Sequence, residues 1–225
     1  MDPGRVFVVR SGPKIERLKI IPPVAALRRG RKYLVGYVGV IGQQEGIDLL
    51  LEAAVHIVLG RKREDVHFGI VGGGPALAEM QRLAATLSIE DYVTFTGRVS
   101  DDDLLAMLNT ADVCVNPDRV NDMNDKSTMN KIMEYMALGK PIVQFEMKEG
   151  RYFAQDASLY AKVNNTGDLA DKLLALIDDP EKSREMGAIG HRRMLSKLSW
   201  EHEAPKLLAA YEFLFGKKSP TLDYV

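Results

Sequence analysis

The stretch Lys126-Ser-Thr-Met-Asn-Lys-Ile-Met-Glu-Tyr-Met-Ala-Leu-Gly-Lys-Pro-Ile-Val-Gln-Phe145 predicts a helix followed by a buried strand. Polar residues suited to capping open the stretch, and apolar residues then recur at helical spacing from Ile132 to Ala137. Gly139 can adopt the left-handed conformation that ends a helix, and Pro141 cannot continue one. Residues 142–145 are typical of a short buried strand.

The start of this predicted helix has the chemistry of an anion-binding site. Because a loop precedes it, its first backbone N–H groups lack helical partners and are free to hold an anion. Glu134 lies one turn inside the helix and places a carboxylate near the same end. A phosphate-binding helix end beside a carboxylate that accepts hydroxyl hydrogen bonds indicates a nucleotide-sugar site.

The composition is that of an ordinary globular protein, with 225 residues, of which 46% are hydrophobic and 27% charged. The net charge of −1 provides no overall field that would recruit nucleic acid. The basic run Arg28-Arg-Gly-Arg-Lys32 is either a solvated loop or a patch for phosphate or lipid, which leaves peripheral membrane contact open. The single cysteine, Cys114, lies in an apolar run and is expected to be a buried structural thiol.

Membrane-spanning and secretory segments are not evident in the sequence. No window approaches the roughly 18 consecutive apolar residues of a membrane span. The N-terminus also lacks the apolar core of a signal peptide. We therefore expect a cytoplasmic protein.

Strands and helices are predicted to alternate along most of the chain. Apolar runs mark expected strands at 34–40, 66–71, 92–95, 113–115, 142–145 and 158–163. Helical patterns are expected at 47–60, 75–87, 100–109, 130–138, 166–177, 180–198 and 200–215. This alternation predicts an α/β fold, a three-layer Rossmann-like domain with a parallel sheet of about six strands and helices on both faces.

The loops at the carboxyl ends of the predicted strands are candidate ligand contacts, because ligands bind such sheets where strand order reverses. They span residues 39–46, 72–75, 97–100 and 116–128. Their glycines are also ordinary turn residues. The last loop carries side chains of a kind that contacts sugars or is simply solvated, namely Asn116, Asp118, Asn121 and Asn124.

Five motifs give the sequence a resemblance to a known family. They are Gly36-Tyr-Val-Gly39 with Glu45–Ala53, Val71-Gly-Gly-Gly-Pro75, Val93-Thr-Phe-Thr-Gly-Arg-Val99, Ala111-Asp-Val-Cys-Val-Asn-Pro117 and Glu134-Tyr-Met-Ala-Leu-Gly-Lys-Pro141. In this order and spacing they resemble the C-terminal, donor-binding half of the retaining glycosyltransferases of GT-B architecture, family four or group 1. The resemblance runs from about Tyr33 to Phe215. It implies transfer of a sugar from a nucleotide diphosphate to an acceptor hydroxyl, in polysaccharide or glycolipid synthesis.

The resemblance also implies roles for individual residues. Glu134 matches the second glutamate of the family's E-x7-E motif, which binds the ribose hydroxyls, although a glutamate that only stabilises the helix end is the alternative. Val99 matches a position whose backbone contacts the base, and its neighbour Arg98 either stacks on the base or lies on the surface. Residues 129–131 match the segment that reaches the diphosphate. The expected donor-binding residues are Gly39, Gly42, Gly73, Arg98, Val99, Met129, Asn130 and Glu134.

Three positions depart from the family pattern. Val40 and Glu45 stand where the first loop usually carries an arginine and a lysine, and Lys126 stands at the first glutamate of E-x7-E. Each charge-assisted bond to a phosphate contributes about 1.5–3 kcal/mol, so losing two would weaken donor binding. We expect Lys126 and Lys131 to supply the missing charge as catalytic residues, with basic residues of the 148–151 segment as another source. A non-catalytic binding or scaffold domain is the alternative.

The resemblance predicts that part of the full enzyme lies outside this chain. Residues 1–32, with a short apolar run at 6–9, are expected to be the last strand of a missing N-terminal domain plus a linker. Residues 33–216 are then the donor-binding domain and 217–225 a tail. The family's acceptor site and catalytic histidine lie in the missing domain, so this chain alone is expected to bind donor without transfer.

The resemblance also implies partners and cofactors. The expected partners are the nucleotide sugar and an acceptor domain or chain, and apolar surface on the closing helix favours self-association. No metal or other cofactor is expected. A nucleotide-sugar 2-epimerase, which shares the fold, remains open.

Overall fold

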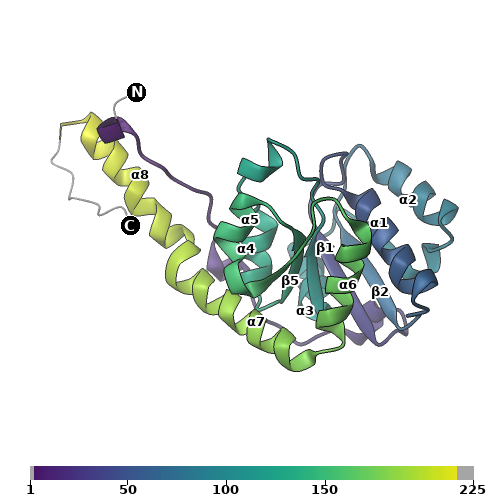
Figure 1. The fold of residues 1–225 in the computed structure, drawn as a ribbon. Helices are drawn as coiled ribbons and strands as arrows, with labels where there is room; N and C mark the ends of the chain where they lie inside the picture. The colour runs from purple at the N-terminus through teal and green to yellow at the C-terminus, as the bar shows by residue number, and fades with distance from the viewer. Residues whose placement is uncertain (1–2, 217–225) are drawn as a thin grey trace.

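The computed structural model describes residues 3–216 and shows a sheet between two layers of helices (Figure 1). The strands are β1 (Tyr33–Val38), β2 (Val66–Val71), β3 (Val93–Gly97), β4 (Val113–Asn116), β5 (Ile142–Phe145) and β6 (Ser158–Ala161). Their order is β3-β2-β1-β4-β5-β6, and every neighbouring pair is parallel. The predicted α/β fold with about six parallel strands is confirmed.

Helices cover both faces of this sheet. The helices of one face are α1 (Ile47–Val55), α2 (Leu77–Thr86) and α6 (Thr166–Ile177), and those of the other are α3 (Asp101–Thr110), α4 (Asn130–Ala137) and α5 (Lys148–Ala154). The chain ends in α7 (Pro180–Arg193) and α8 (Trp200–Leu214). In β1, Val35 and Tyr37 face the first layer while Leu34 and Val38 face the second. Both faces of a covered strand are therefore apolar, as its continuous hydrophobic run predicts.

The helix and strand of the opening stretch form as predicted. Gly139 has φ 65° and ends α4, while the N–H of Lys140 donates to the carbonyl of Tyr135 at 2.9 Å. This arrangement satisfies the last carbonyls of the helix and turns the chain directly into β5.

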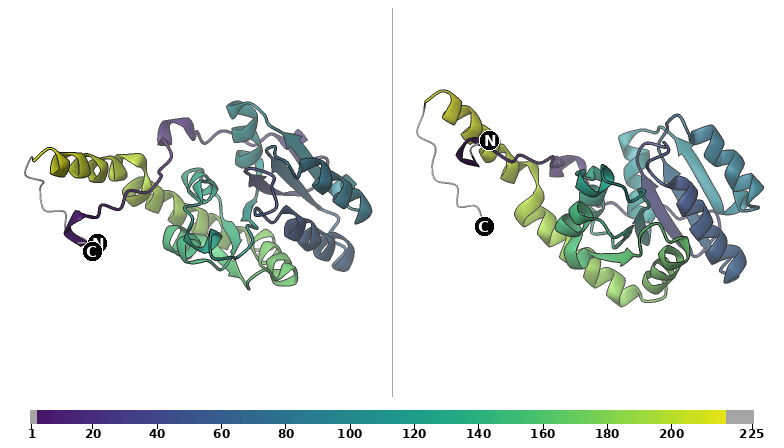
Figure 2. Two further views of the ribbon diagram at one scale, coloured as in Figure 1. Left: turned by 90° about the horizontal axis from the view of Figure 1, so that it is seen from above. Right: turned by 45° about the horizontal axis from the view of Figure 1, so that its top comes forward.

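The strand expected at residues 6–10, as part of a domain outside this chain, does not form among the described residues, and that expectation stays a prediction. Residues 6–14 form no regular element, because a strand needs a hydrogen-bonded neighbour and no described segment pairs with them. They lie beside α8, which extends away from the sheet (Figure 2). The rings of Phe7 and Phe213 are 5.6 Å apart between centroids, and the N–H of Arg10 donates to Glu203 Oε2 at 2.9 Å. The proposed domain division stays a prediction, and its 217–225 tail lies outside the described residues.

Two smaller predictions also need correction. α5 occupies a segment for which the pattern predicts no helix, and its buried Phe153 and the Arg193 side chain, which donates to the Phe153 carbonyl at 2.8 Å, stabilise it. Tertiary contacts thus override a weak local preference. The cap of α6 lies one residue before the helix expected at 166–177, because the Asn165 side chain accepts from the N–H of Asp168 at 2.9 Å.

The basic run at 28–32 is bound to the domain. Arg28 pairs with Asp112 and donates to the Thr110 carbonyl at 3.1 Å. The Arg31 guanidinium lies 3.8 Å from the centroid of the Tyr92 ring. These contacts join the N-terminal segment to the sheet, and peripheral membrane contact stays a prediction. Within residues 3–216, no helix has the length and apolar character needed to cross a bilayer.

Candidate functional site

A cleft opens where the strand order reverses. β1 leads through α1 to β2 on one side, whereas β4 lies on its other side, so the loops that leave β1 and β4 diverge. The pairing of β1 with β4 is limited to Val35 with Val113 and Gly36 with Cys114. A cavity of about 540 Å³ lies between the two loops and the start of α4. This volume lies within the usual range for small-molecule sites.

Tyr135 of α4 joins the two strands where their own ladder ends. Its hydroxyl accepts from the N–H of Val38 at 3.0 Å and donates to the carbonyl of Val115 at 3.2 Å. Burial raises the pKa of Tyr135, so the neutral phenol keeps both bonds. Tyr135 therefore fixes α4 against β1 and β4 beside the cleft, a role that sequence reasoning missed. The available signal was a polar hydroxyl on an otherwise apolar helix face.

The N-terminus of α4 has no side-chain cap. The N-cap residue is Met129, and Ser127, one of the polar residues before it, donates to the carbonyl of Met123 at 2.7 Å instead of capping the helix. Within residues 3–216, the backbone N–H groups of Asn130 and Lys131 have no hydrogen-bond acceptor. Residues 129–131 all line the cleft, so uncapped amides and the positive end of the helix dipole are available to an anion there.

Glu134 also lines the cleft, one turn further along α4. Burial raises the pKa of its carboxyl, an effect that the nearby charges of Arg17 and Lys131 partly offset, and among the described residues the carboxylate has no hydrogen bond or close ion pair. Because a desolvated carboxylate gains most from strong donors, vicinal sugar hydroxyls are suitable partners.

Gly39 brings the first loop close to the rest of the site. A Cβ at Gly39 would lie 2.5 Å from the Tyr37 hydroxyl and 3.2 Å from Lys131 Cε. The Tyr37 hydroxyl donates to the Val40 carbonyl at 2.9 Å, so it is not free to move aside. A Cβ at Gly72 would overlap the carbonyl oxygen of Gly39. The loops after β1 and β2 thus pack backbone against backbone, and the absence of side chains at these glycines leaves room for a ligand to approach the same edge.

The charges that line the cleft are mainly negative. They are the carboxylates of Glu45, Asp118 and Glu134 and the ammonium of Lys131. Lys131 Nζ lies 2.6 Å from Asp118 Oδ1 and 2.9 Å from Asp118 Oδ2. The side chains of Lys131 and Asp118 are only 12% and 5% exposed, and burial raises the pKa of the Asp118 carboxyl. The one cation of the lining is therefore already paired.

The other predicted sources of positive charge lie away from this cleft. Lys126 is exposed and is not part of the lining. Lys148 pairs with Asp125 at 3.3 Å, and Arg151 pairs with Glu146 at 2.8 Å. Of the two lysines predicted to act together, only Lys131 belongs to the lining, and a catalytic role for either one stays a prediction.

The structure divides the expected donor-binding residues into two groups. Four line the cleft, namely Gly39, Met129, Asn130 and Glu134. Four lie outside the lining, namely Gly42, Gly73, Arg98 and Val99. Gly42 lies against the Glu45 carboxylate, and Gly73 lies against the Arg98 side chain, at the same sheet edge. Val99 packs against the apolar cluster that contains α4. Contact of Arg98 and Val99 with a base stays a prediction.

The polar residues of the loop after β4 hold that loop together. Asn124 Nδ2 donates to the carbonyls of Gln44 at 3.2 Å and Arg119 at 2.9 Å. Asn121 Oδ1 accepts from the N–H groups of Met123 and Asn124. Asn121 and Asn124 thus stabilise the loop rather than being simply solvated, and contact of this loop with a sugar stays a prediction.

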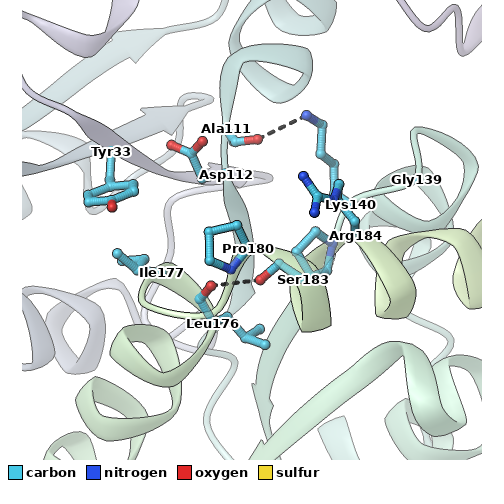
Figure 3. A pocket seen from close by; sticks show the side chains of 11 residues that line it. Tyr33, Ala111, Asp112, Gly139, Lys140, Leu176, Ile177, Pro180, Ser183 and Arg184 are labelled. Atoms are coloured by element: carbon cyan, nitrogen blue, oxygen red, sulfur yellow. Dashed lines mark hydrogen bonds between the residues drawn. The ribbon is translucent and has the colours of Figure 1, made fainter.

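A second cavity, of about 260 Å³, lies at the opposite, amino edge of the sheet (Figure 3). Lys140 Nζ donates to the carbonyls of Asn109 at 2.6 Å and Ala111 at 2.9 Å. Ser183 Oγ donates to the carbonyl of Leu176 at 2.7 Å. The amino-edge cavity is mostly apolar in its surroundings and its buried polar groups are satisfied, so we assign the ligand site to the carboxyl edge.

Comparison with known proteins places the chain in a family. A family model described as Glycosyl transferases group 1 matches residues 32–179, about two thirds of the chain. The chain belongs to this family. The resemblance of the five motifs to group 1 glycosyltransferases is therefore confirmed.

Two curated relatives illustrate the range of this family. The alpha-D-kanosaminyltransferase of Streptomyces kanamyceticus is 28% identical over 155 residues, which cover 68% of this chain and 38% of that protein. A GDP-mannose-dependent alpha-(1-6)-phosphatidylinositol monomannoside mannosyltransferase of Mycobacterium tuberculosis is 30% identical over 178 residues, 77% of this chain and 45% of that protein. The chain spans less than half the length of either group 1 relative.

Solved glycosyltransferase structures share the fold. The Anabaena Alr3699/HepE structure in complex with UDP-glucose has a TM-score of 0.75 at 18% identity, covering 92% of this chain and 57% of that chain. The C-terminal domain of a group 1 glycosyl transferase (LpcC) from Francisella tularensis has a TM-score of 0.70 at 16% identity, covering 84% of this chain and 99% of that chain. At these identities the likeness shows the fold alone.

Groups suited to a metal ion are not found at the cleft. Within residues 3–216, no set of three or more His, Cys, Asp or Glu side chains has the arrangement of a metal site. The metal-free chemistry implied by the resemblance stays a prediction.

Proposed function

We propose that this chain is the donor-binding half of a nucleotide-sugar-dependent retaining glycosyltransferase. The observation that carries the proposal is the convergence of three features on one cleft. They are the uncapped amides of α4, the Glu134 carboxylate without a hydrogen-bond partner among the described residues, and the first loop, whose close approach to Lys131 requires a glycine at position 39. Each alone is ordinary, but together they match an anion carried on a hydroxyl-bearing sugar.

In this proposal the protein acts by binding and orientation. The amides of Asn130 and Lys131, with the α4 dipole, hold the diphosphate and stabilise the charge that it gains as it leaves the sugar. Glu134 accepts the ribose hydroxyls and fixes the nucleotide relative to that helix end. The acceptor hydroxyl is brought by residues outside this chain, so the chain alone binds donor without transferring its sugar.

The charge of the cleft favours a second candidate, a nucleotide-sugar-binding domain without catalysis. Val40 and Glu45 line the cleft at positions where the resemblance implies cations, and Lys131 is paired with Asp118. A leaving diphosphate would thus receive little positive charge from side chains. We rank transfer first because the group 1 relatives are named as transferases, which is also why we rank it above epimerisation.

A thermal-shift screen tests the proposed function. The ligands are uridine, guanosine and adenosine diphosphates and their sugar conjugates. At about 100 times its dissociation constant, a bound ligand adds about 2.7 kcal/mol to the free energy of unfolding, which raises Tm by about 5–10 °C for a chain of this size. Glu134→Gln is the matched variant, because it keeps the size of the side chain and removes its charge. A wild-type protein that no member of the panel stabilises would contradict the proposal.

A further inference from the structure

The ammonium of Lys131 has little capacity left for a ligand. An ammonium carries three N–H donors. Two are directed to the Asp118 carboxylate at 2.6 and 2.9 Å, and Asn116 Oδ1 lies at 3.3 Å. The ring of Tyr37 covers another side, with its centroid 5.4 Å from Nζ. The cation that faces the cleft is therefore surrounded by the protein's own acceptors.

We propose that Asp118 limits the affinity of the cleft for a diphosphate by competing with it for the Lys131 ammonium. This inference rests on the proposed function, since it concerns the same cleft and the same anion. It assigns Asp118 as a residue that lowers affinity, although its position in the loop after β4 suggests a sugar contact. A bound phosphate must either displace an oxygen of Asp118 or accept a position next to its negative charge.

The geometry shows which contact gives way first. The bond from Lys131 to Asn116 is the longest of the three, and the buried Asn116 Nδ2 has no partner within residues 3–216. Both oxygens of Asp118, in contrast, lie within normal hydrogen-bond distance. A phosphate oxygen that reaches Lys131 from the cleft and replaces Asn116 as its third acceptor would therefore share Lys131 with Asp118, and two anions would lie against one cation.

Neighbouring charges make this competition stronger. From the loop after β1, Glu45 faces the cleft without an ion-pair partner among the described residues, and from α4, Glu134 does the same. The nearest further lysine in the loop, Lys126, is outside the cleft lining. No second cation of the lining therefore offsets the Asp118 charge when an anion binds.

The substitution Asp118→Asn tests the competition directly. The amide keeps the size of the side chain and an acceptor for Lys131, but it removes the negative charge. We expect the variant to bind a nucleoside diphosphate about tenfold more tightly, measured by calorimetry with the diphosphate that stabilises the wild type most. The matched control is Asp125→Asn, which alters a carboxylate of the same loop that pairs with Lys148 at 3.3 Å. This control should leave the dissociation constant unchanged.

A double-mutant cycle shows whether the effect acts through Lys131. In a Lys131→Met background, Asp118→Asn should lose most of its tenfold gain, because no ammonium remains to be released. Asp118→Ser gives a second uncharged variant with the same expectation if the asparagine variant does not fold. A purely structural role for Asp118 would instead weaken binding and lower Tm in every background.

Two results separate this inference from the proposed function. If the wild type binds a nucleoside diphosphate and Asp118→Asn binds it equally or more weakly, the competition is wrong and the proposed function stands. If neither the wild type nor any variant binds a nucleoside diphosphate, both are wrong.

Discussion

The two edges of the sheet differ in whether their main charged and polar groups have hydrogen-bond partners. At the amino edge, Asp112 pairs with Arg28 and accepts from the N–H of Leu34 at 2.8 Å, and Lys140 donates to two backbone carbonyls. At the carboxyl edge, the amides at the start of α4 lack acceptors and Glu134 lacks a compensating donor among the described residues. At the amino edge Asp112 and Lys140 are thus fully paired, although the buried His67 Nδ1 and Arg31 Nε have no partner among the described residues, whereas the carboxyl edge keeps unpaired groups that line a cleft and that a ligand can satisfy.

This contrast has an energetic meaning. Buried polar groups are normally satisfied, because each one left without a partner costs about 1–3 kcal/mol. A protein tolerates such groups mainly where a ligand supplies the missing partner. The contrast therefore predicts that substitutions at the two edges affect stability and binding with different signs.

The largest expected effect is a loss of protein stability in acid, caused by protonation of His67 in the amino half of β2. Burial lowers the pKa of His67 to about 4, and its Nε2 lies 2.8 Å from Thr94 Oγ1. Because the folded-state pKa lies below the unfolded value of about 6.5, His67 contributes fully above pH 6.5, and the contribution is lost as pH falls towards 4. The loss amounts to about 3 kcal/mol.

Urea unfolding between pH 7 and pH 4 measures this loss. His67→Gln serves as the control, because glutamine can still bond to Thr94 but does not titrate. If the wild type and His67→Gln lose stability in parallel over this range, His67 does not contribute as described.

The next largest effect follows from a substitution at the amino edge, which should lower the stability of the protein without weakening its binding of a nucleoside diphosphate. Asp112→Ala removes the partner of Arg28 and the acceptor for the Leu34 N–H. We expect a loss of about 2 kcal/mol in the free energy of unfolding, since a partly buried charge and an amide lose their partner. Denaturant unfolding measures the loss, and calorimetry of the folded variant should show wild-type affinity for the nucleoside diphosphate. A large fall in affinity would show that the amino edge also contributes to ligand binding and would contradict the distinction between the two edges.

At the carboxyl edge, Glu134→Gln should change stability and binding in opposite directions. Burial raises the pKa of Glu134, so ionisation at pH 7 disfavours the folded state and removing the charge should stabilise it by about 1 kcal/mol. A carboxylate bond to sugar hydroxyls is stronger than an amide bond, so affinity for a nucleoside diphosphate should fall about tenfold. Thermal unfolding and calorimetry measure the two effects. If stability and affinity fall together, Glu134 has a structural role instead.

The smallest effect tests the first loop. Glu45→Lys replaces a carboxylate of the cleft lining by the cation that the resemblance implies at this position. We expect affinity for a nucleoside diphosphate to rise about threefold, because exposed charges near a ligand are screened by salt. The gain should shrink between 50 mM and 500 mM salt. A salt-independent change would exclude this electrostatic explanation.

Local patterns predict the elements of this fold well. The spacing from Ile132 to Ala137, with Gly139 and Pro141 after it, is enough to place α4 and β5, because capping and periodicity act within a few residues. The segment at 6–9 shows the limit of such patterns. An apolar run is typical of a strand, but only a neighbouring strand makes it one.

The details of the site depend on contacts that no local pattern reports. Lys131 and Asp118 are 13 residues apart and meet only because β4 and α4 are neighbours. The resemblance leads to the expectation that Lys131 supplies charge to a phosphate, and only the folded structure shows that Asp118 already binds Lys131. The same holds for Tyr135, whose hydroxyl joins β1 to β4. The cleft could be predicted, but the charge balance inside it could not.

The most direct test of the account is a nuclear magnetic resonance titration of backbone amides with a nucleoside diphosphate. The account predicts shifts concentrated at Gly39 and at residues 129–131, which line the carboxyl-edge cleft. The amides of Gly139 and Lys140, beside the amino-edge cavity, should keep their positions. Shifts concentrated at the amino edge, or no shifts with any nucleoside diphosphate, would contradict the account.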